Sequence, residues 1–141
     1  MAPRNIIQVV LLAIAGVCCD LFMFLRWPGE RDAIRWIGLV VSLIGLAGVI
    51  SARCTLGRSF SVRAKATRLV TGGLYSRIRN PIYVSGMFFI AGMIIMLRMP
   101  LLALVFVILI PVQIRRARQE ASVLESTFGD EYRRYRARTW F

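Results

Sequence analysis

The sequence predicts an all-α integral membrane protein, a single domain over residues 1–141 with about four transmembrane helices. Hydrophobic residues make up 57% of the chain and charged residues only 18%, a balance that is typical of membrane proteins. Apolar runs alternate with polar segments, and each run approaches the ~20 residues that a helix needs to cross a bilayer. The expected spans lie approximately at residues 6–25, 36–52, 82–97 and 101–114.

The first apolar run, Ile6 to Leu25, is followed by Arg26 and Trp27, and we expect Trp27 to lie at the membrane interface. Asp20 interrupts this run and allows two interpretations. It is either an interfacial carboxylate that pairs with Arg26, or a functional carboxylate inside the membrane. The second interpretation suits a small four-span transporter or channel subunit that uses Asp20.

The second span follows a short charged loop at residues 29–35. Ser42, Gly45 and Gly48 recur in it at helical spacing and share one face of the expected helix. Because small residues let membrane helices approach closely, we expect this face to pack against another helix.

The longest polar stretch, Arg53 to Arg79, holds seven basic residues and no acidic one. The positive-inside rule places such a loop in the cytoplasm, and an even number of spans then places both termini there. Gly72 and Gly73 free the backbone within this loop. Pro81 suits the first turn of the third span, with Asn80 as its cap.

The third and fourth spans are joined by Arg98-Met99-Pro100, a turn so short that they must form an antiparallel hairpin. Beyond the fourth span the chain is polar but rich in helix formers. Gly129 ends this helix, and residues 130–138 form a further short helix of a C-terminal amphipathic segment. We expect the aromatic end, Trp140-Phe141, to lie at the membrane interface.

Composition also limits the chemistry. The chain has no histidine, which excludes histidine-based catalysis and histidine-ligated zinc, and its three cysteines show no metal-binding spacing, so we expect no metal site. The net charge of +12 comes from basic residues beside the apolar spans, where they meet anionic lipid headgroups. No nucleic-acid-binding motif accompanies them, so the expected partners are membrane lipids and not nucleic acids.

Arg116 and Glu120 stand four residues apart and therefore share one face of the helix that leaves the fourth span. They form either a surface ion pair of little energetic weight or a polar clamp that faces the segment from Tyr75 to Tyr83. An antiparallel hairpin returns the chain to its starting depth. The turn at Asn80 to Tyr83 and the Arg116/Glu120 pair are therefore expected to be neighbours.

Five short motifs follow one another over about the last ninety residues. They are Leu56-Gly57-Arg58, Leu69-Val70-Thr71-Gly72-Gly73-Leu74-Tyr75, Arg79-Asn80-Pro81-Ile82-Tyr83, Arg116-x-x-x-Glu120-x-x-x-Leu124 and Phe128-Gly129-Asp130-Glu131-Tyr132-x-x-Tyr135. In this order and spacing, the set resembles the isoprenylcysteine carboxyl methyltransferase family, which is related to the phospholipid methyltransferases.

The resemblance implies a membrane methyltransferase that uses S-adenosyl-L-methionine, with a cofactor pocket covered from the cytosol and a lipid-like or small hydrophobic acceptor entering from the bilayer. It assigns the cofactor site to the segments 67–83 and 115–135. Arg116 matches a residue placed toward the substrate, and we take it as the catalytic candidate. The positions that match the family's cofactor-binding residues are Thr67, Arg68, Leu69, Val70, Tyr75, Asn80, Pro81, Ile82, Tyr83 and Glu120.

Two positions depart from the family pattern. Asn80 stands where the eukaryotic enzymes usually have histidine, and Ala121 where a second acidic residue is common. The acceptor is therefore open between a carboxylate, a thiol and an amine, although Arg116 favours an anionic one. A reductase of similar C-terminal arrangement that uses NADPH is a further alternative. The expected location is a bacterial inner membrane; the oligomeric state is left open.

Overall fold

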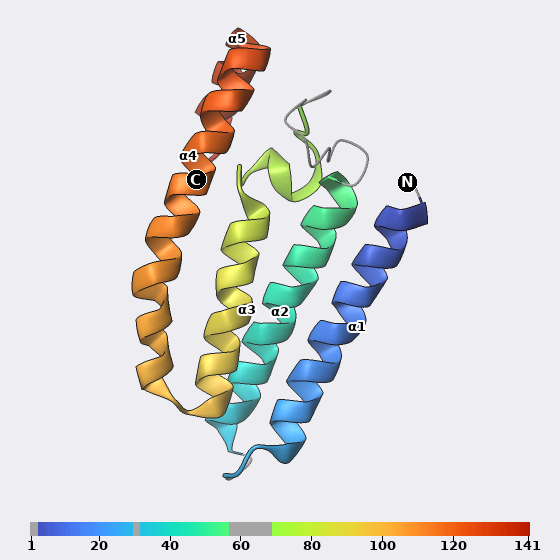
Figure 1. Cartoon of the computed structure of the whole chain (residues 1–141), viewed down its shortest axis with the longest axis vertical. Coiled ribbons are helices and arrows are strands. Elements are labelled where there is room, and N and C mark those ends of the chain that lie inside the picture. Colours follow the sequence, from blue (N-terminus) through green and yellow to red (C-terminus); the bar gives the residue numbers. More distant parts are fainter. Residues whose placement is uncertain (1–2, 30–31, 57–68) are drawn as a thin grey trace.

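The computed structural model describes residues 3–29, 32–56 and 69–141, which fold into helices joined by short turns, with no β-strand among them. The elements, in chain order, are α1 (Pro3–Arg26), α2 (Ala33–Leu56), the 3₁₀ helix η1 (Gly73–Ser76), α3 (Pro81–Leu97), the 3₁₀ helix η2 (Pro100–Leu104), α4 (Val105–Phe128) and α5 (Asp130–Arg138). The helices α1 to α4 lie side by side, and both chain ends lie toward the end of the bundle that carries α5 (Figure 1). The predicted all-α membrane fold is confirmed.

Within the described part of the chain, three helical segments are long and apolar enough to cross a membrane: Ile6–Arg26, Ala33–Leu56 and Pro100–Phe128. α3 is a shorter apolar helix of 17 residues. α4 runs without a break from its apolar half into its polar half, so the fourth span and the helix after it form one rod. The predicted loop at residues 29–35 is too long, because α2 already begins at Ala33.

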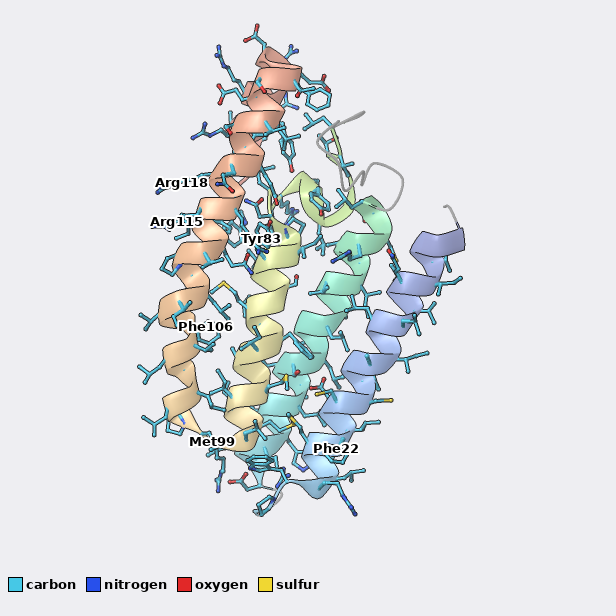
Figure 2. All side chains as sticks on the ribbon, in the orientation of Figure 1. Phe22, Tyr83, Met99, Phe106, Arg115 and Arg118 are labelled. Atoms are coloured by element: carbon cyan, nitrogen blue, oxygen red, sulfur yellow. The ribbon has the colours of Figure 1, made fainter. Side chains whose placement is uncertain are left out.

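The outer surface of the bundle is apolar along most of its length. Leu11 and Ile14 on α1 and Val107 and Ile108 on α4 are exposed. Figure 2 shows the charged side chains gathered at the two ends of the bundle, with apolar side chains projecting between them. A helix that is apolar on its outer face can lie in lipid, because its backbone N–H and C=O groups are hydrogen-bonded within the helix. We call the end formed by residues 69–80 and 115–141 the polar end.

The helices α2 and α3 pack backbone to backbone. A Cβ atom added to Gly92 would lie 2.2 Å from the Ser42 nitrogen, and one added to Gly45 would lie 2.3 Å from the Phe89 nitrogen. These separations leave no room for a side chain, which is how small residues bring membrane helices together. The predicted face of Ser42, Gly45 and Gly48 is therefore a helix interface, and Gly92 is its counterpart on α3.

Asp20 is fully buried, and Ser42 Oγ donates a hydrogen bond of 2.8 Å to its Oδ1. Its Oδ2 has no hydrogen-bond partner among the described residues. Arg26, the partner expected for an interfacial carboxylate, is exposed instead. The contact ties α1 to α2 by an interhelical hydrogen bond, a type that contributes about 0.6 kcal/mol on average in membrane proteins.

Arg35 closes the turn between α1 and α2. Its side chain is 2% exposed, and its guanidinium donates to the backbone carbonyls of Met23, Phe24, Trp27 and Gly29 at 2.8–3.0 Å. The last carbonyls of a helix have no partner within it, so this arginine satisfies the carboxyl end of α1. The guanidinium also lies 5.5 Å from the centre of the Phe24 ring.

The turn between α3 and α4 is held to the turn between α1 and α2. Arg98 ends α3 in a left-handed conformation, with φ of 54°, and its guanidinium forms an ion pair with Asp32. α3 and α4 are therefore the predicted antiparallel hairpin, fixed at the end of the bundle opposite the polar end (Figure 1).

Candidate functional site

The candidate site begins at the first turn of α3. Pro81 occupies the first helical position and is buried, and the carbonyl of Asn80 accepts the backbone N–H groups of Tyr83 and Val84. Asn80 is the cap residue by position, as predicted. Its side chain, however, makes no capping hydrogen bond within the described structure. Proline at this position suits a helix start, because the missing N–H has no partner there in any case.

The first turn of α3 meets α4 through a side-chain contact. The hydroxyl of Tyr83 donates a hydrogen bond to Oε1 of Glu120, which lies 37 residues further along the chain. Figure 2 labels Tyr83 at the polar end of α3, beside α4. The hairpin thus brings these two residues together. Among the described residues, Glu120 bonds to Tyr83 and forms no ion pair with Arg116.

Two further residues act on this contact electrostatically. The Arg116 guanidinium lies within electrostatic range of the Tyr83 hydroxyl. Tyr75, on η1, is 8% exposed, and burial raises the pKa of its phenol, with smaller raising contributions from Tyr135 and Glu120. The Tyr75 phenol therefore stays neutral at physiological pH. The polar end thus contains a carboxylate (Glu120), a cation (Arg116) and two phenols (Tyr75 and Tyr83).

The C-terminal residues form a strap over the segment that precedes α3. The N–H of Trp140 donates to the carbonyl of Arg77 at 3.0 Å, and the N–H groups of Arg79 and Asn80 donate to the carbonyls of Trp140 and Phe141 at 3.1 Å. Ile78 and Trp140 thereby form a parallel β-bridge. No sequence pattern predicts this backbone pairing. The sequence predicts only that the aromatic residues Trp140 and Phe141 lie at the membrane interface.

A side-chain bond reinforces the strap. The hydroxyl of Tyr135, on α5, donates to the carbonyl of Tyr75 at 2.7 Å. Burial, followed by Tyr132, raises the pKa of Tyr135 to about 12, while Arg79 acts in the opposite direction. Since the phenol remains protonated below that pH, the bond persists under ordinary conditions. It fixes η1 to the C-terminal helix.

The remaining predicted cofactor-binding residues lie around the same end. Leu69 is buried and Val70 is half-buried on the segment that leads to η1, and Ile82 is half-buried in the first turn of α3. Thr67 and Arg68 lie outside the described residues, as do residues 57–66 of the same polar loop. The polar end thus brings together Tyr75, the turn from Asn80 to Tyr83, Arg116 and Glu120.

The donor set at the polar end suits a ligand that carries charges of both signs. The Glu120 carboxylate suits an ammonium group, and phenol rings suit a second cation or a flat aromatic group. The first turn of α3 offers the N–H of Ile82 and the positive end of the helix dipole to an anion. The N–H groups of Arg79 and Asn80 are already bonded to the strap, so they do not contribute.

Comparison with known proteins identifies the family. Residues 33–131 match the family model described as phospholipid methyltransferase, which is more than half of the chain. The chain is also 31% identical over 121 residues to the mouse protein-S-isoprenylcysteine O-methyltransferase, an alignment that covers 79% of this chain and 42% of the mouse protein. The chain therefore spans about two fifths of the length of this curated relative. Because the matched range, residues 33–131, runs from the start of α2 to beyond the end of α4, the chain belongs to the phospholipid methyltransferase family.

Proposed function

We propose that this protein transfers a methyl group from S-adenosyl-L-methionine to a lipid-like or small hydrophobic acceptor at the membrane surface. The observation that carries the proposal is the hydrogen bond between Tyr83 and Glu120, because it joins two family motifs at one end of the hairpin. When bound, the sulfonium of the donor supplies an activated methyl group. The protein then has to bind the donor, align the acceptor and exclude water.

Glu120 binds the amino group of the donor in this proposal. Its carboxylate is oriented by the Tyr83 hydroxyl, which leaves its other oxygen for a charge-assisted bond to an ammonium. Tyr75 and Tyr83 present aromatic rings to the adenine or to the sulfonium, as a cation–π contact. The N–H of Ile82 and the start of α3 receive the donor carboxylate.

Arg116 holds the acceptor. Its guanidinium lies near Tyr83 and is exposed, so it can reach a group that enters from the membrane surface. Guanidinium binds carboxylate and phosphate in a bidentate manner, and this favours an acidic acceptor over an amine. In-line methyl transfer needs no covalent nucleophile on the enzyme, and the protein's part is alignment at close range.

The topology follows from the distribution of charge. Arg77 and Arg79 and the many arginines beyond residue 114 lie at the polar end, whereas Arg35 and Arg98 lie at the opposite end. By the positive-inside rule, the polar end and both termini face the cytoplasm. A bacterial inner membrane is the location that we propose.

A binding measurement tests the proposal. Purified protein in detergent should bind S-adenosylhomocysteine in isothermal titration calorimetry, and Glu120→Ala should abolish the binding. Gln119→Ala is the control, since Gln119 is the exposed neighbour of Glu120 on α4 and is specified by none of the five motifs, and it should bind as the wild type does. Wild-type affinity in Glu120→Ala would reject the assigned role of Glu120, and stabilisation by NADPH without S-adenosylhomocysteine binding would favour a reductase.

A further inference from the structure

Two cavities follow one another along the junction of α3 and α4. The first, of about 280 Å³, lies between the two helices and has a mainly apolar lining that includes Val84, Met87 and Phe88 of α3 and Ile110 of α4, with Gln113 as a polar member. The second, of about 460 Å³, lies at the polar end between α4, α5 and the start of α3. Ile114 and Phe141 line both cavities, so the two are adjacent.

The second cavity is basic. Arg79, Arg118 and Arg136 line it, together with the carboxylate of Glu125. Glu125 is already paired with Arg133 and with Arg136, at 3.0 and 3.8 Å. The Nε of Arg79 is buried and has no hydrogen-bond partner among the described residues. Arg79 and Arg118 therefore leave the cavity with a positive charge that an anion would neutralise.

The second cavity shares Asn80 with the candidate methyl-donor site, but its lining does not include Tyr83, Arg116 or Glu120. On α4, this lining runs from Ile114 through Arg118 to Glu125, which is one face of that helix. Glu120 and Arg116 each lie about 160° around the helix from Arg118, at ~100° per residue. The same helix thus presents the Tyr83 contact on one side and the basic cavity on the other.

We propose that the paired cavities bind an anionic phospholipid of the leaflet that borders the polar end. An acyl chain fills the apolar cavity, and the phosphate lies against Arg118 and Arg79. The positions of the two cavities along α4 match those of the acyl chain and the phosphate of a lipid. Arg118 follows Ile114 by one helical turn, a rise of about 6 Å, which leads from the hydrocarbon region to the headgroups. Water in the first cavity would find one polar side chain in the lining, Gln113, whereas an acyl chain buries the apolar walls.

The chemistry selects this occupant over related ones. Free phosphate would use the arginines and leave the apolar cavity unfilled. A zwitterionic lipid would bring an ammonium group toward Arg118 and Arg136, where like charges repel. A phosphodiester with an uncharged alcohol headgroup, such as phosphatidylglycerol, satisfies both cavities. The lipid is a bound ligand of the fold here and not the methyl acceptor.

Native mass spectrometry of the full chain, released from detergent after incubation with defined lipids, tests this inference. We expect phosphatidylglycerol to be retained, with phosphatidylcholine and inorganic phosphate retained far less. Arg79→Gln with Arg118→Gln should weaken phosphatidylglycerol retention about tenfold or more, since each arginine makes a charged hydrogen bond. The charge-matched control is Arg115→Gln with Arg134→Gln, two exposed arginines outside the cavity lining, and it should retain the lipid.

Several outcomes would overturn the proposal. Equal retention of phosphatidylglycerol and phosphatidylcholine by the wild type would show that the basic cavity does not select the lipid. Equal loss in the two double variants would show a general charge effect. Should the Arg79 variant fail to fold, Arg118→Gln alone carries the test, with Arg115→Gln as its control. Displacement of the lipid by S-adenosylhomocysteine would place it in the donor site, whereas failure of donor binding alone leaves the lipid site intact.

Discussion

The hydroxyl of Tyr83, in the first turn of α3, donates a hydrogen bond to the carboxylate of Glu120 in the polar half of α4. The pairing depends on the α3–α4 hairpin, which is fixed at its other end by the ion pair between Arg98 and Asp32. A carboxylate held by a phenol keeps one rotamer, so less conformational entropy is lost when it binds a cation. Tyr83 is thus a positioning residue for Glu120 in the proposed site.

Removal of the Tyr83 hydroxyl should weaken donor binding through Glu120. A hydrogen bond to a charged group contributes about 1.5–3 kcal/mol, so Tyr83→Phe should lower the affinity for S-adenosylhomocysteine about tenfold. Glu120→Gln should lower it further, and the double variant should bind no more weakly than Glu120→Gln alone. Isothermal titration calorimetry measures all three. Losses that simply add would mean that the two side chains act independently.

Replacement of Arg116 should separate turnover from donor binding. Arg116→Ala should reduce kcat/KM for an acidic acceptor about 100-fold or more, because two charge-assisted bonds to that acceptor are lost, while S-adenosylhomocysteine affinity stays within about twofold. Arg115→Ala, the adjacent exposed arginine, should change neither quantity. Equal losses of turnover and donor affinity in Arg116→Ala would assign this residue to the donor and not to the acceptor.

Sequence reasoning works where local patterns determine the structure. Span lengths follow from hydropathy, the start of α3 follows from Asn80-Pro81, and the end of α4 follows from Gly129. The contact between Tyr83 and Glu120 could also be predicted from the sequence, because a very short turn makes α3 and α4 antiparallel neighbours. These inferences need no knowledge of contacts between distant side chains.

Other features depend on tertiary contacts that no local pattern carries. The sequence places Arg35 in a charged loop, yet its side chain is buried and donates hydrogen bonds to backbone carbonyls at the end of α1. The sequence predicts Trp140 as an interfacial aromatic and gives no sign that its backbone pairs with Arg77 and Arg79. Backbone pairing of this kind is independent of side-chain identity, so it leaves no signature in composition or spacing. The strap and the basic cavity beside it could therefore be found only in three dimensions.

A methyl group at the α2–α3 interface should destabilise the bundle. Gly92→Ala places a Cβ 2.2 Å from the Ser42 nitrogen, a backbone atom that cannot move aside, so we expect a loss of about 1–3 kcal/mol or more in thermal or denaturant unfolding. Gly86→Ala on the same helix is the control, because its Cβ would meet nothing within 4 Å. The control should match the wild type or exceed it slightly, since alanine favours helix over glycine. Similar losses in both variants would mean that the interface is not tightly packed.

Alkaline pH should loosen the strap through Tyr135. Its pKa in the folded protein is about 12, whereas an exposed tyrosine titrates near pH ~10. The folded state therefore keeps a proton that the unfolded chain loses, so the contribution of Tyr135 to stability is complete below pH ~10 and is lost as the pH rises toward ~12. The buried phenol of Tyr75, whose pKa is also raised, acts in the same direction.

Thermal unfolding in detergent, followed by tryptophan fluorescence from pH 7 to 12, measures this effect. The wild type should hold its midpoint to about pH 10 and then lose it steeply. Tyr135→Phe removes the bond to the Tyr75 carbonyl, so it should be less stable by about 1 kcal/mol at pH 8. Its midpoint should also fall less steeply above about pH 10, because one of the titrating phenols is gone. Parallel curves for the two proteins would show that Tyr135 does not link protonation to the strap.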